Sequence, residues 1–383
     1  MMWLGGLFVL LSLAWVIAHT SGYGAEVRVS QRPLGHPSNP PIKRPLTEPP
    51  SDGPSLFGTN LEAIPSLINE EDDLELTIVT ASPSADMPAS ASSKPAPSSG
   101  AIRVETPSVK VIYEDEAELE EVTLPHARIL ISANAGSDTG RHRPRNEDSL
   151  LVLPERSLFV VADGMGGYEG GEVASSLAVE TIRRAFEKNV FEGNTEADSS
   201  IPRRGREMAC AIQMANQAVI RRAKDTPALR NMGTTVIAAR FSPNKQRVYI
   251  GHVGDSRCYR LRGATLRQLT TDHTLRELGM KGPSSKQLFQ AVGIRPTITI
   301  DLVVDKPRPQ DIYLLCSDGL SKMVSDDQVR AVLRAEPDLE AAVLTLIEKA
   351  NEQGGRDNVT VILVKIIERG AVEQIASLSA GNS

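Results

Sequence analysis

The chain has 383 residues, of which 40% are hydrophobic, and a formal net charge of −6. This length allows one large or two small domains, and the negative charge argues against a general nucleic-acid binder. The three cysteines form no Cys-x-x-Cys pair and the six histidines are scattered, which argues against a disulfide framework or a zinc–cysteine site. We therefore expect any metal ion to be held by oxygen ligands.

Residues 2–18 are an uncharged apolar run, MWLGGLFVLLSLAWVIA. Its length is at the short end for a membrane-spanning helix, and no Lys or Arg precedes it as in a secretory signal peptide. The first basic residues, Arg28 and Arg32, follow it, so the positive-inside tendency predicts that the rest of the chain is cytoplasmic. We expect a single-pass anchor in the cytoplasmic membrane. A cleaved signal peptide or a misassigned start codon would instead make the protein exported or soluble.

Residues 19–125 have a different composition from the rest of the chain. Fifteen of the 25 prolines lie here among Ser, Ala and Thr, together with acidic clusters at 70–75 and 114–121. No amphipathic period persists along the segment. This composition predicts a disordered or extended linker.

Regular patterns of secondary structure extend over residues 128–367, and residues 368–383 are expected to be a flexible tail. Helices are predicted after the glycines near 170 and at 206–224, 327–334 and 339–351. The helices occur in blocks and do not alternate with strands, which favours an α+β fold with largely antiparallel sheets. Runs rich in Val, Ile and Leu predict strands at 128–136, 149–153, 157–163, 234–241, 247–255, 297–304, 311–318 and 358–366.

Acidic residues stand at the ends of these apolar strands. Asp163, Asp255 and Asp318 each end a strand-like run, and Asp357 comes directly before another. Singly, each is explained by ordinary turn and capping chemistry. Together, they would repel one another at one sheet edge unless a cation neutralised them. Oxygen ligands of this kind suit Mg²⁺ and Mn²⁺.

The segment SDTGRHRPRNEDS adds two further acids, Glu147 and Asp148, and three arginines around Arg143. A guanidinium offers a planar fork that matches phosphate oxygens, although one Arg in a charged loop is usually solvated. Acids that hold two metal ions, with an arginine nearby, indicate metal-assisted hydrolysis of phosphoesters.

The stretch VVADGMGGYEGGEVASS, residues 160–176, has a second interpretation. A strand, a glycine-rich turn and a helix are also the signature of dinucleotide-binding oxidoreductases. The spacing after Gly164 lacks the usual third glycine of Gly-x-Gly-x-x-Gly, and Asp163 stands where it would disfavour a pyrophosphate. We therefore favour a carboxylate presented to a metal ion.

Seven motifs occur in an order that resembles the bacterial branch of the metal-dependent Ser/Thr protein phosphatases (PPM, or type 2C). The resemblance covers residues 130–367 and implies a four-layer α-β-β-α sandwich with two central antiparallel sheets. No Cys-x5-Arg loop is present for covalent thiol chemistry. The motifs are SDTGRHRPRNEDS, VVADGMGGYEGGE, NMGTTVIAA, HVGDSRCYRLRG, LTTDHT, LLCSDGLSKMV and GGRDNVTVILV.

The resemblance also implies a set of metal ligands. Asp163 would bridge two Mn²⁺ or Mg²⁺ ions. Asp318 and Asp357 would complete one site, and Glu147 and the carbonyl group of Gly164 would serve the other. A water between the two ions would attack phosphorus directly, with no phosphoenzyme.

Three further roles follow from the resemblance. Asp148 would orient the attacking water, and Arg143 would bind the phosphate. Asp255, with Asp318, would hold a third, weaker ion. The resemblance implies phosphoserine and phosphothreonine proteins as substrates, with a Ser/Thr kinase of the same cell as a candidate partner. We expect a monomer that does not bind nucleic acid.

Two departures from the family pattern stand out. Met165 replaces the His that many eukaryotic members use as a candidate general acid, and the segment between His273 and Gly293 is shorter than the usual bacterial flap. We interpret His273 as a structural residue beside a loop and His252 as a core residue whose polar atoms are satisfied. The alternatives to an active phosphatase are a catalytically weak, membrane-tethered, phosphoprotein-binding relative and a scaffold that acts through its linker.

Overall fold

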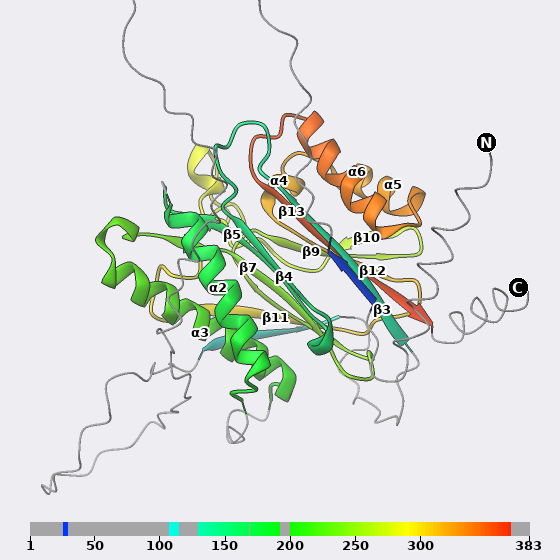
Figure 1. Cartoon of the computed structure of the whole chain (residues 1–383), viewed down its shortest axis with the longest axis horizontal. Coiled ribbons are helices and arrows are strands. Elements are labelled where there is room, and N and C mark those ends of the chain that lie inside the picture. The colour runs from blue at the N-terminus through cyan, green and yellow to red at the C-terminus, as the bar shows by residue number, and fades with distance from the viewer. Residues whose placement is uncertain (1–25, 30–106, 115–128, 168, 192–199, 369–383) are drawn as a thin grey trace, which may run out of the picture.

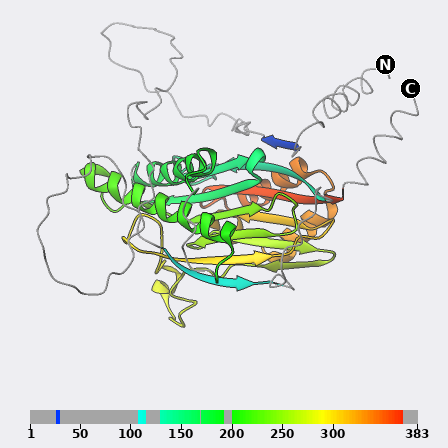
Figure 2. The ribbon, with the colours of Figure 1, turned by 90° about the horizontal axis from the view of Figure 1, so that it is seen from below.

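Two β-sheets packed face to face form the centre of the molecule, with helices on both outer sides. The computed structural model of the chain describes residues 26–29, 107–114, 129–167, 169–191 and 200–368. Helices α2 and α3 lie on one side of the strands, away from α5 and α6 (Figures 1 and 2). The predicted α+β class with two sheets is therefore confirmed.

The first sheet has the order β1-β3-β13-β12-β9-β10. Except at β1, its neighbouring strands run antiparallel, and β3 pairs with β13 along its whole length. The strands are β1 (Glu26–Val29), β3 (Ile129–Asp138), β13 (Val359–Glu368), β12 (Ile312–Cys316), β9 (Arg257–Arg262) and β10 (Thr265–Gln268).

The second sheet has the order β2-β11-β8-β7-β5-β4, and the short β6 pairs with the end of β5. Apart from β2, these pairs are also antiparallel. The strands are β2 (Ser108–Tyr113), β11 (Thr299–Asp305), β8 (Val248–Val253), β7 (Val236–Phe241), β5 (Leu158–Met165), β4 (Asp148–Leu153) and β6 (Gly233–Thr234).

Strands β1 and β2 correct two sequence expectations. Both strands lie inside the segment predicted to be a disordered linker. Both also pair in parallel with an edge of a sheet that was expected to be antiparallel: β1 pairs with β3, and β2 pairs with β11. Val109 and Val111 of β2 pack against the buried Leu302 and Val304. This long-range burial stabilises a strand whose proline- and serine-rich surroundings hide it in the sequence.

Helices cover the outer face of each sheet. Helices α2 (Gly170–Glu187) and α3 (Arg203–Asp225) pack on the second sheet, and α6 (Leu339–Glu352) packs on β3 and β13. Helix α5 (Asp326–Ala335) contacts α6, and the short α4 (Asp318–Ser321) follows β12. The four predicted helices occur where they were expected, whereas α4, β9 and β10 were not predicted.

Strand β5 is buried on both faces, which accounts for its continuous apolar run. Val160 and Ala162 face the helices α2 and α3, and Phe159 and Val161 lie between the two sheets. Asp163 is the next residue along this strand. The packing of the core on both faces of β5 therefore fixes the backbone position from which the Asp163 side chain extends.

In the described part of the chain, no helix is long and apolar enough to cross a membrane. The anchor expected at residues 2–18 and the tail expected at 368–383 lie outside the described residues, apart from Glu368 at the end of β13.

Candidate active site

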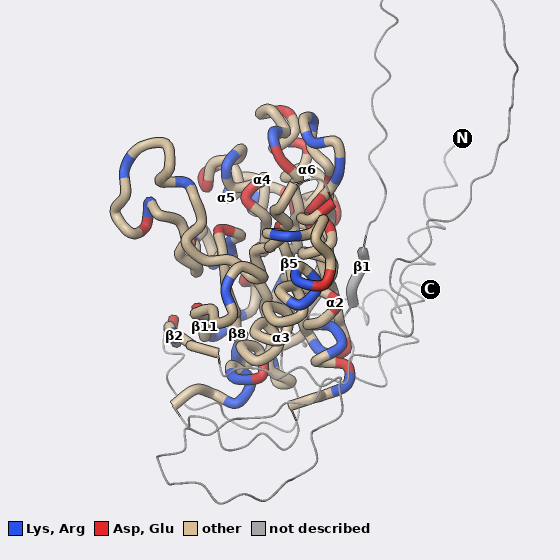
Figure 3. Tube along the Cα trace, turned by 90° about the vertical axis from the view of Figure 1, so that its left-hand side faces the viewer, with Lys and Arg blue, Asp and Glu red and all other residues tan. Residues whose placement is uncertain are grey.

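A cavity of about 930 Å³ opens where the strand ends of the two sheets meet. The structure places seven of the eight predicted site residues on its wall, and Asp148 lies behind the wall at the start of β4. Acidic and basic segments lie together beside α4 in this region (Figure 3). The predicted residues on the wall are Arg143, Glu147, Asp163, Gly164, Asp255, Asp318 and Asp357.

Strand pairing brings Asp148 and Asp163 face to face. They are register partners on β4 and β5. The backbone N–H of Asp163 donates to Thr235 Oγ1 at 3.0 Å, and that of Gly164 donates to the carbonyl oxygen of Glu147 at 3.1 Å. The sheet therefore holds acids from two different motifs at fixed positions.

Two hydroxyl groups hold one oxygen of Asp148. Ser317 Oγ and Thr360 Oγ1 each donate to Asp148 Oδ2 at 2.7 Å. Burial raises the pKa of the Asp148 carboxyl to about 6, although these two hydrogen bonds act to lower the pKa. Sequence reasoning missed Ser317 and Thr360, because a hydroxyl residue in an apolar strand gives no sign of its partner.

Burial also raises the pKa of other acids in the cavity. The pKa of Asp163 lies well above its ordinary value, first because the group is buried and then because Asp148, Asp255 and Asp357 repel its negative charge. Burial likewise raises the pKa of Glu147 and Asp255. Ionising this group of acids together is therefore unfavourable without nearby positive charge.

Two basic side chains supply part of that charge. Arg143 forms a bidentate salt bridge with Asp357, in which Nε lies 2.9 Å from Oδ1 and Nη2 lies 2.9 Å from Oδ2. Its Nη1 lies 3.9 Å from Oε2 of Glu147. The ammonium group of Lys322 contacts Asp318 and lies 3.5 Å from Asp255 Oδ2. Lys322 was not among the predicted residues, although its spacing of four from Asp318 on a helical turn is a signal that could have found it.

Asn358 and two glycines set the loop that carries Arg143 and Glu147. Asn358 Nδ2 donates to the carbonyl oxygens of Thr139 and Arg145, and its Oδ1 accepts from the N–H of Glu147. A Cβ on Gly171 would lie 2.9 Å from the Glu147 carboxylate, and one on Gly164 would lie 2.1 Å from the Gly171 carbonyl oxygen. The glycines therefore allow this loop, β5 and α2 to approach closely.

A family model described as protein phosphatase 2C matches residues 136–358, more than half of the chain. The chain belongs to the protein phosphatase 2C family. The predicted family and enzyme class, a protein-serine/threonine phosphatase of bacterial type, are confirmed.

Similar proteins include two bacterial phosphatases. The serine/threonine phosphatase Stp of Listeria welshimeri is 35% identical over 243 residues, which cover 60% of this chain and 93% of that protein. The serine/threonine protein phosphatase PstP of Mycobacterium tuberculosis is 34% identical over 254 residues, covering 63% of this chain and 46% of that protein.

Solved structures agree with this assignment. A crystal structure of Mycobacterium tuberculosis PstP is similar with a TM-score of 0.54 and 33% identity, over 62% of this chain and 99% of that chain. A structure of the PstP catalytic domain in complex with two manganese ions has a TM-score of 0.53, also at 33% identity and with the same coverage. The predicted use of Mn²⁺ or Mg²⁺ agrees with that complex.

The acids of this protein phosphatase 2C domain fit a pair of divalent cations. Within the described residues, Asp148 Oδ1 and Asp318 Oδ1 are buried oxygens without a hydrogen-bond partner. Such orphaned buried oxygens indicate a group that the protein atoms do not supply. Carboxylates and carbonyl oxygens are the ligands that Mg²⁺ and Mn²⁺ prefer.

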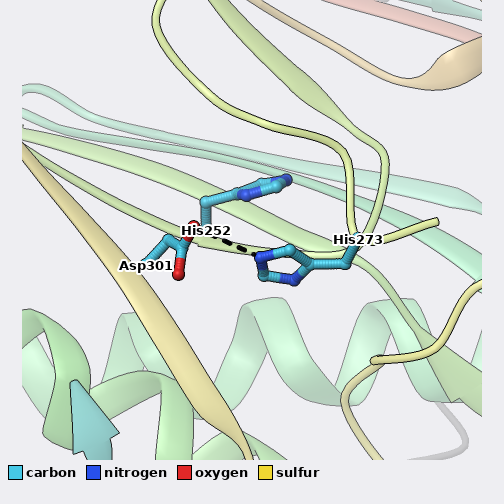
Figure 4. Close-up of side chains that lie close together, drawn as sticks. All are labelled: His252, His273 and Asp301. Carbon is cyan, nitrogen blue, oxygen red and sulfur yellow. Dashed lines mark ion pairs between the residues drawn. The ribbon is translucent and has the colours of Figure 1, made fainter. Parts of the chain in front are cut away.

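A second cluster, behind Asp255, is less suited to a metal ion. His252, His273 and Asp301 each offer a ligand atom within 4.8 Å of the others (Figure 4). However, His273 Nδ1 faces two donors at 3.2 Å, the N–H of Gly254 and the amide of Gln290. His273 Nδ1 is therefore an acceptor, and its Nε2 carries the hydrogen that points toward Asp301, 3.5 Å away.

Hydrogen bonds from His273 instead position the loop before Asp255. Its backbone N–H donates to the carbonyl oxygen of Gly254 at 2.7 Å, while its ring accepts from the N–H of Gly254. These contacts agree with the structural role expected for His273. His252 is fully buried in β8, as expected for a core residue. Neither of its ring nitrogens has a hydrogen-bond partner among the described residues, so the expectation that its polar atoms are satisfied is wrong.

Replacing Gly164 with Ala tests the close approach of β5 to α2. The new Cβ would meet the backbone oxygens of Gly171 at 2.1 Å and Glu147 at 2.6 Å, so we expect a loss of about 1–3 kcal/mol in the free energy of unfolding. Gly170→Ala is the matched control, because its Cβ would only approach the Met232 side chain, at 3.3 Å. Urea unfolding of both variants should show the difference, and equal stability would contradict it.

The raised pKa of the buried acids predicts how Mn²⁺ stabilisation depends on pH. A carboxyl whose pKa is higher in the folded chain than in the unfolded chain stabilises the fold at low pH. This stability is lost as the pH rises from the pKa of the unfolded chain to that of the folded chain. For Asp148, this range is from about pH 4 to about pH 6. Protons compete with Mn²⁺ for the buried carboxyls as pH falls through their folded-state pKa values, about 6 for Asp148. We expect Mn²⁺ to raise Tm more at about pH 7 than at about pH 5.

Thermal unfolding with and without Mn²⁺ measures this effect. Asp163→Asn, which keeps the shape of the side chain but removes its charge, should lose most of the Mn²⁺-dependent rise at both pH values. A rise that is equal or larger at the lower pH would show that these carboxyls do not bind the ion.

Proposed function

We propose that this chain hydrolyses phosphoserine and phosphothreonine in proteins by direct attack of water on phosphorus. The observation that carries the proposal is the convergence of five predicted acids and Arg143 on one cavity in a protein phosphatase 2C domain. Stp and PstP, which are similar over this domain, are serine/threonine phosphatases by name. All the motif acids are present, which disfavours a catalytically weak binding relative.

In this proposal, Asp163 would contribute a carboxylate to both of two divalent-cation sites. Asp318 and Asp357 would complete one site, and Glu147 and the carbonyl group of Gly164 would contribute to the other. When bound, such ions supply the positive charge that lowers the pKa of water and screens the phosphoryl oxygens. Side chains of the protein bind the phosphoryl group and position the attacking water.

Arg143 binds and orients the phosphoryl group. Its side chain is 45% exposed at the cavity wall, and its fork geometry matches phosphate oxygens as it matches Asp357. If the guanidinium of Arg143 released Asp357 to bind the phosphoryl group, the Asp357 carboxylate would be free to bind a cation. Substrate binding by Arg143 is therefore coupled to cation binding by Asp357.

Asp148 positions the attacking water in the proposed mechanism. Ser317 and Thr360 hold its Oδ2, so Oδ1 remains to accept a hydrogen from water. With a pKa of about 6, this carboxyl is largely ionised near neutral pH and is able to accept a proton. Met165 stands beside the cavity and cannot donate a proton to the leaving group.

Substitutions of Asp163 and Arg143 test this function. On a phosphothreonine peptide with Mn²⁺, Asp163→Asn should reduce phosphate release to background, and Arg143→Ala should reduce kcat/KM by about 10²–10³-fold. Asp327→Asn is the control, because this acid lies on α5 with its side chain 81% exposed. EDTA should abolish turnover until Mn²⁺ is restored, and full turnover in EDTA would end the metal proposal.

We also propose that residues 2–18 anchor the chain in the cytoplasmic membrane with the phosphatase domain in the cytoplasm. The support is the apolar run itself and the basic residues that follow it. The proposed substrates are then cytoplasmic phosphoproteins, with a Ser/Thr kinase of the same cell as the partner.

A reporter that is active only in the periplasm tests this orientation. Fused after residue 40, it should remain inactive, whereas a reporter active in the cytoplasm should function at the same position. High activity of the periplasmic reporter would show that the chain is exported.

A further inference from the structure

Lys322 joins two acids that come from different parts of the fold. Asp255 follows β8, and Asp318 is the first residue of α4. The Lys322 ammonium contacts Asp318 Oδ2, four residues earlier in the chain, and lies 3.5 Å from Asp255 Oδ2. All three side chains line the same cavity. One positive charge therefore stands between two carboxylates.

The two carboxylates that Lys322 approaches are both buried. Asp255 is only 7% exposed and Asp318 only 8%. Buried carboxylates of this kind need a partner of opposite charge, and Lys322 is in contact with Asp318 and near Asp255.

We propose that the Lys322 ammonium takes the place of a third divalent ion between Asp255 and Asp318, so that the chain binds two ions rather than three. The inference rests on the proposed function, because it concerns the same ligand set. It also revises the sequence-based expectation that Asp255 and Asp318 share a third, weaker ion.

Coulomb repulsion gives the reason for this exclusion. An ammonium and a dication held by the same two carboxylates would lie a few ångströms apart, where like charges repel strongly in a partly buried site. Lys322 is tethered to the same helical turn as Asp318, so it returns to the site without competition from solution. A free ion must displace it, and its side chain would have to leave the cavity wall.

The number of Mn²⁺ ions bound by the full chain at saturation tests the proposal. Equilibrium dialysis followed by elemental analysis should give two ions for the wild type and three for Lys322→Ala. Lys322→Arg, which keeps the charge, should give two. Lys286→Ala should also give two, because Lys286 lines the same cavity but forms no ion pair with an acid among the described residues.

The outcomes separate this inference from the proposed function. A wild-type chain that binds three ions and hydrolyses a phosphopeptide would overturn the role of Lys322 alone, and so would a Lys322→Ala chain that still binds two. A wild-type chain that binds no Mn²⁺ would contradict the proposed function as well. Thermal unfolding of Lys322→Ala checks that the variant is folded before its ions are counted.

Discussion

The constraint on which the site depends is the cost of placing several carboxylates in one partly buried cavity. Ionised carboxyl groups lose hydration when they are buried, and they repel one another. In this structure, burial and mutual repulsion both raise the pKa of Asp163. Hydroxyl donors on Asp148, the guanidinium of Arg143 and the ammonium of Lys322 each relieve part of this cost. Of the two orphaned oxygens among the described acids of the site, Asp318 Oδ1 favours a divalent cation and Asp148 Oδ1 remains for water.

The apolar core is what keeps these acids together. Strand β5 is buried on one face against α2 and α3 and on the other against the first sheet, so it has little freedom to shift. Strand β12 is buried in the same way, with Leu314 facing the helices and Leu315 facing the second sheet. Asp163 lies within β5, and Asp318 follows the end of β12 by two residues. Repulsion between the acids therefore does not separate them.

Sequence reasoning found the acids but not the groups that hold them. Asp163 and Asp318 were predictable, because an acid after a long apolar run is unusual and several of them suggest a common edge. Ser317, Thr360 and Asn358 were not, because their hydrogen bonds join residues that are distant in sequence, such as Thr360 and Asp148. Strand β2 was missed for a similar reason, since its burial depends on β11, about 190 residues later in the chain.

The glycine-rich stretch shows how the same local pattern serves different chemistry. Helix α2 begins at Gly170, and the Glu147 carboxylate lies beside Gly171 in its first turn. A negative group is favoured at a helix N-terminus, whether it belongs to a phosphate or to a carboxylate. Here the protein's own carboxylate occupies that position, and Asp163 precedes the turn. The glycines therefore bring acids close together, and this arrangement attracts cations rather than a nucleotide's phosphates.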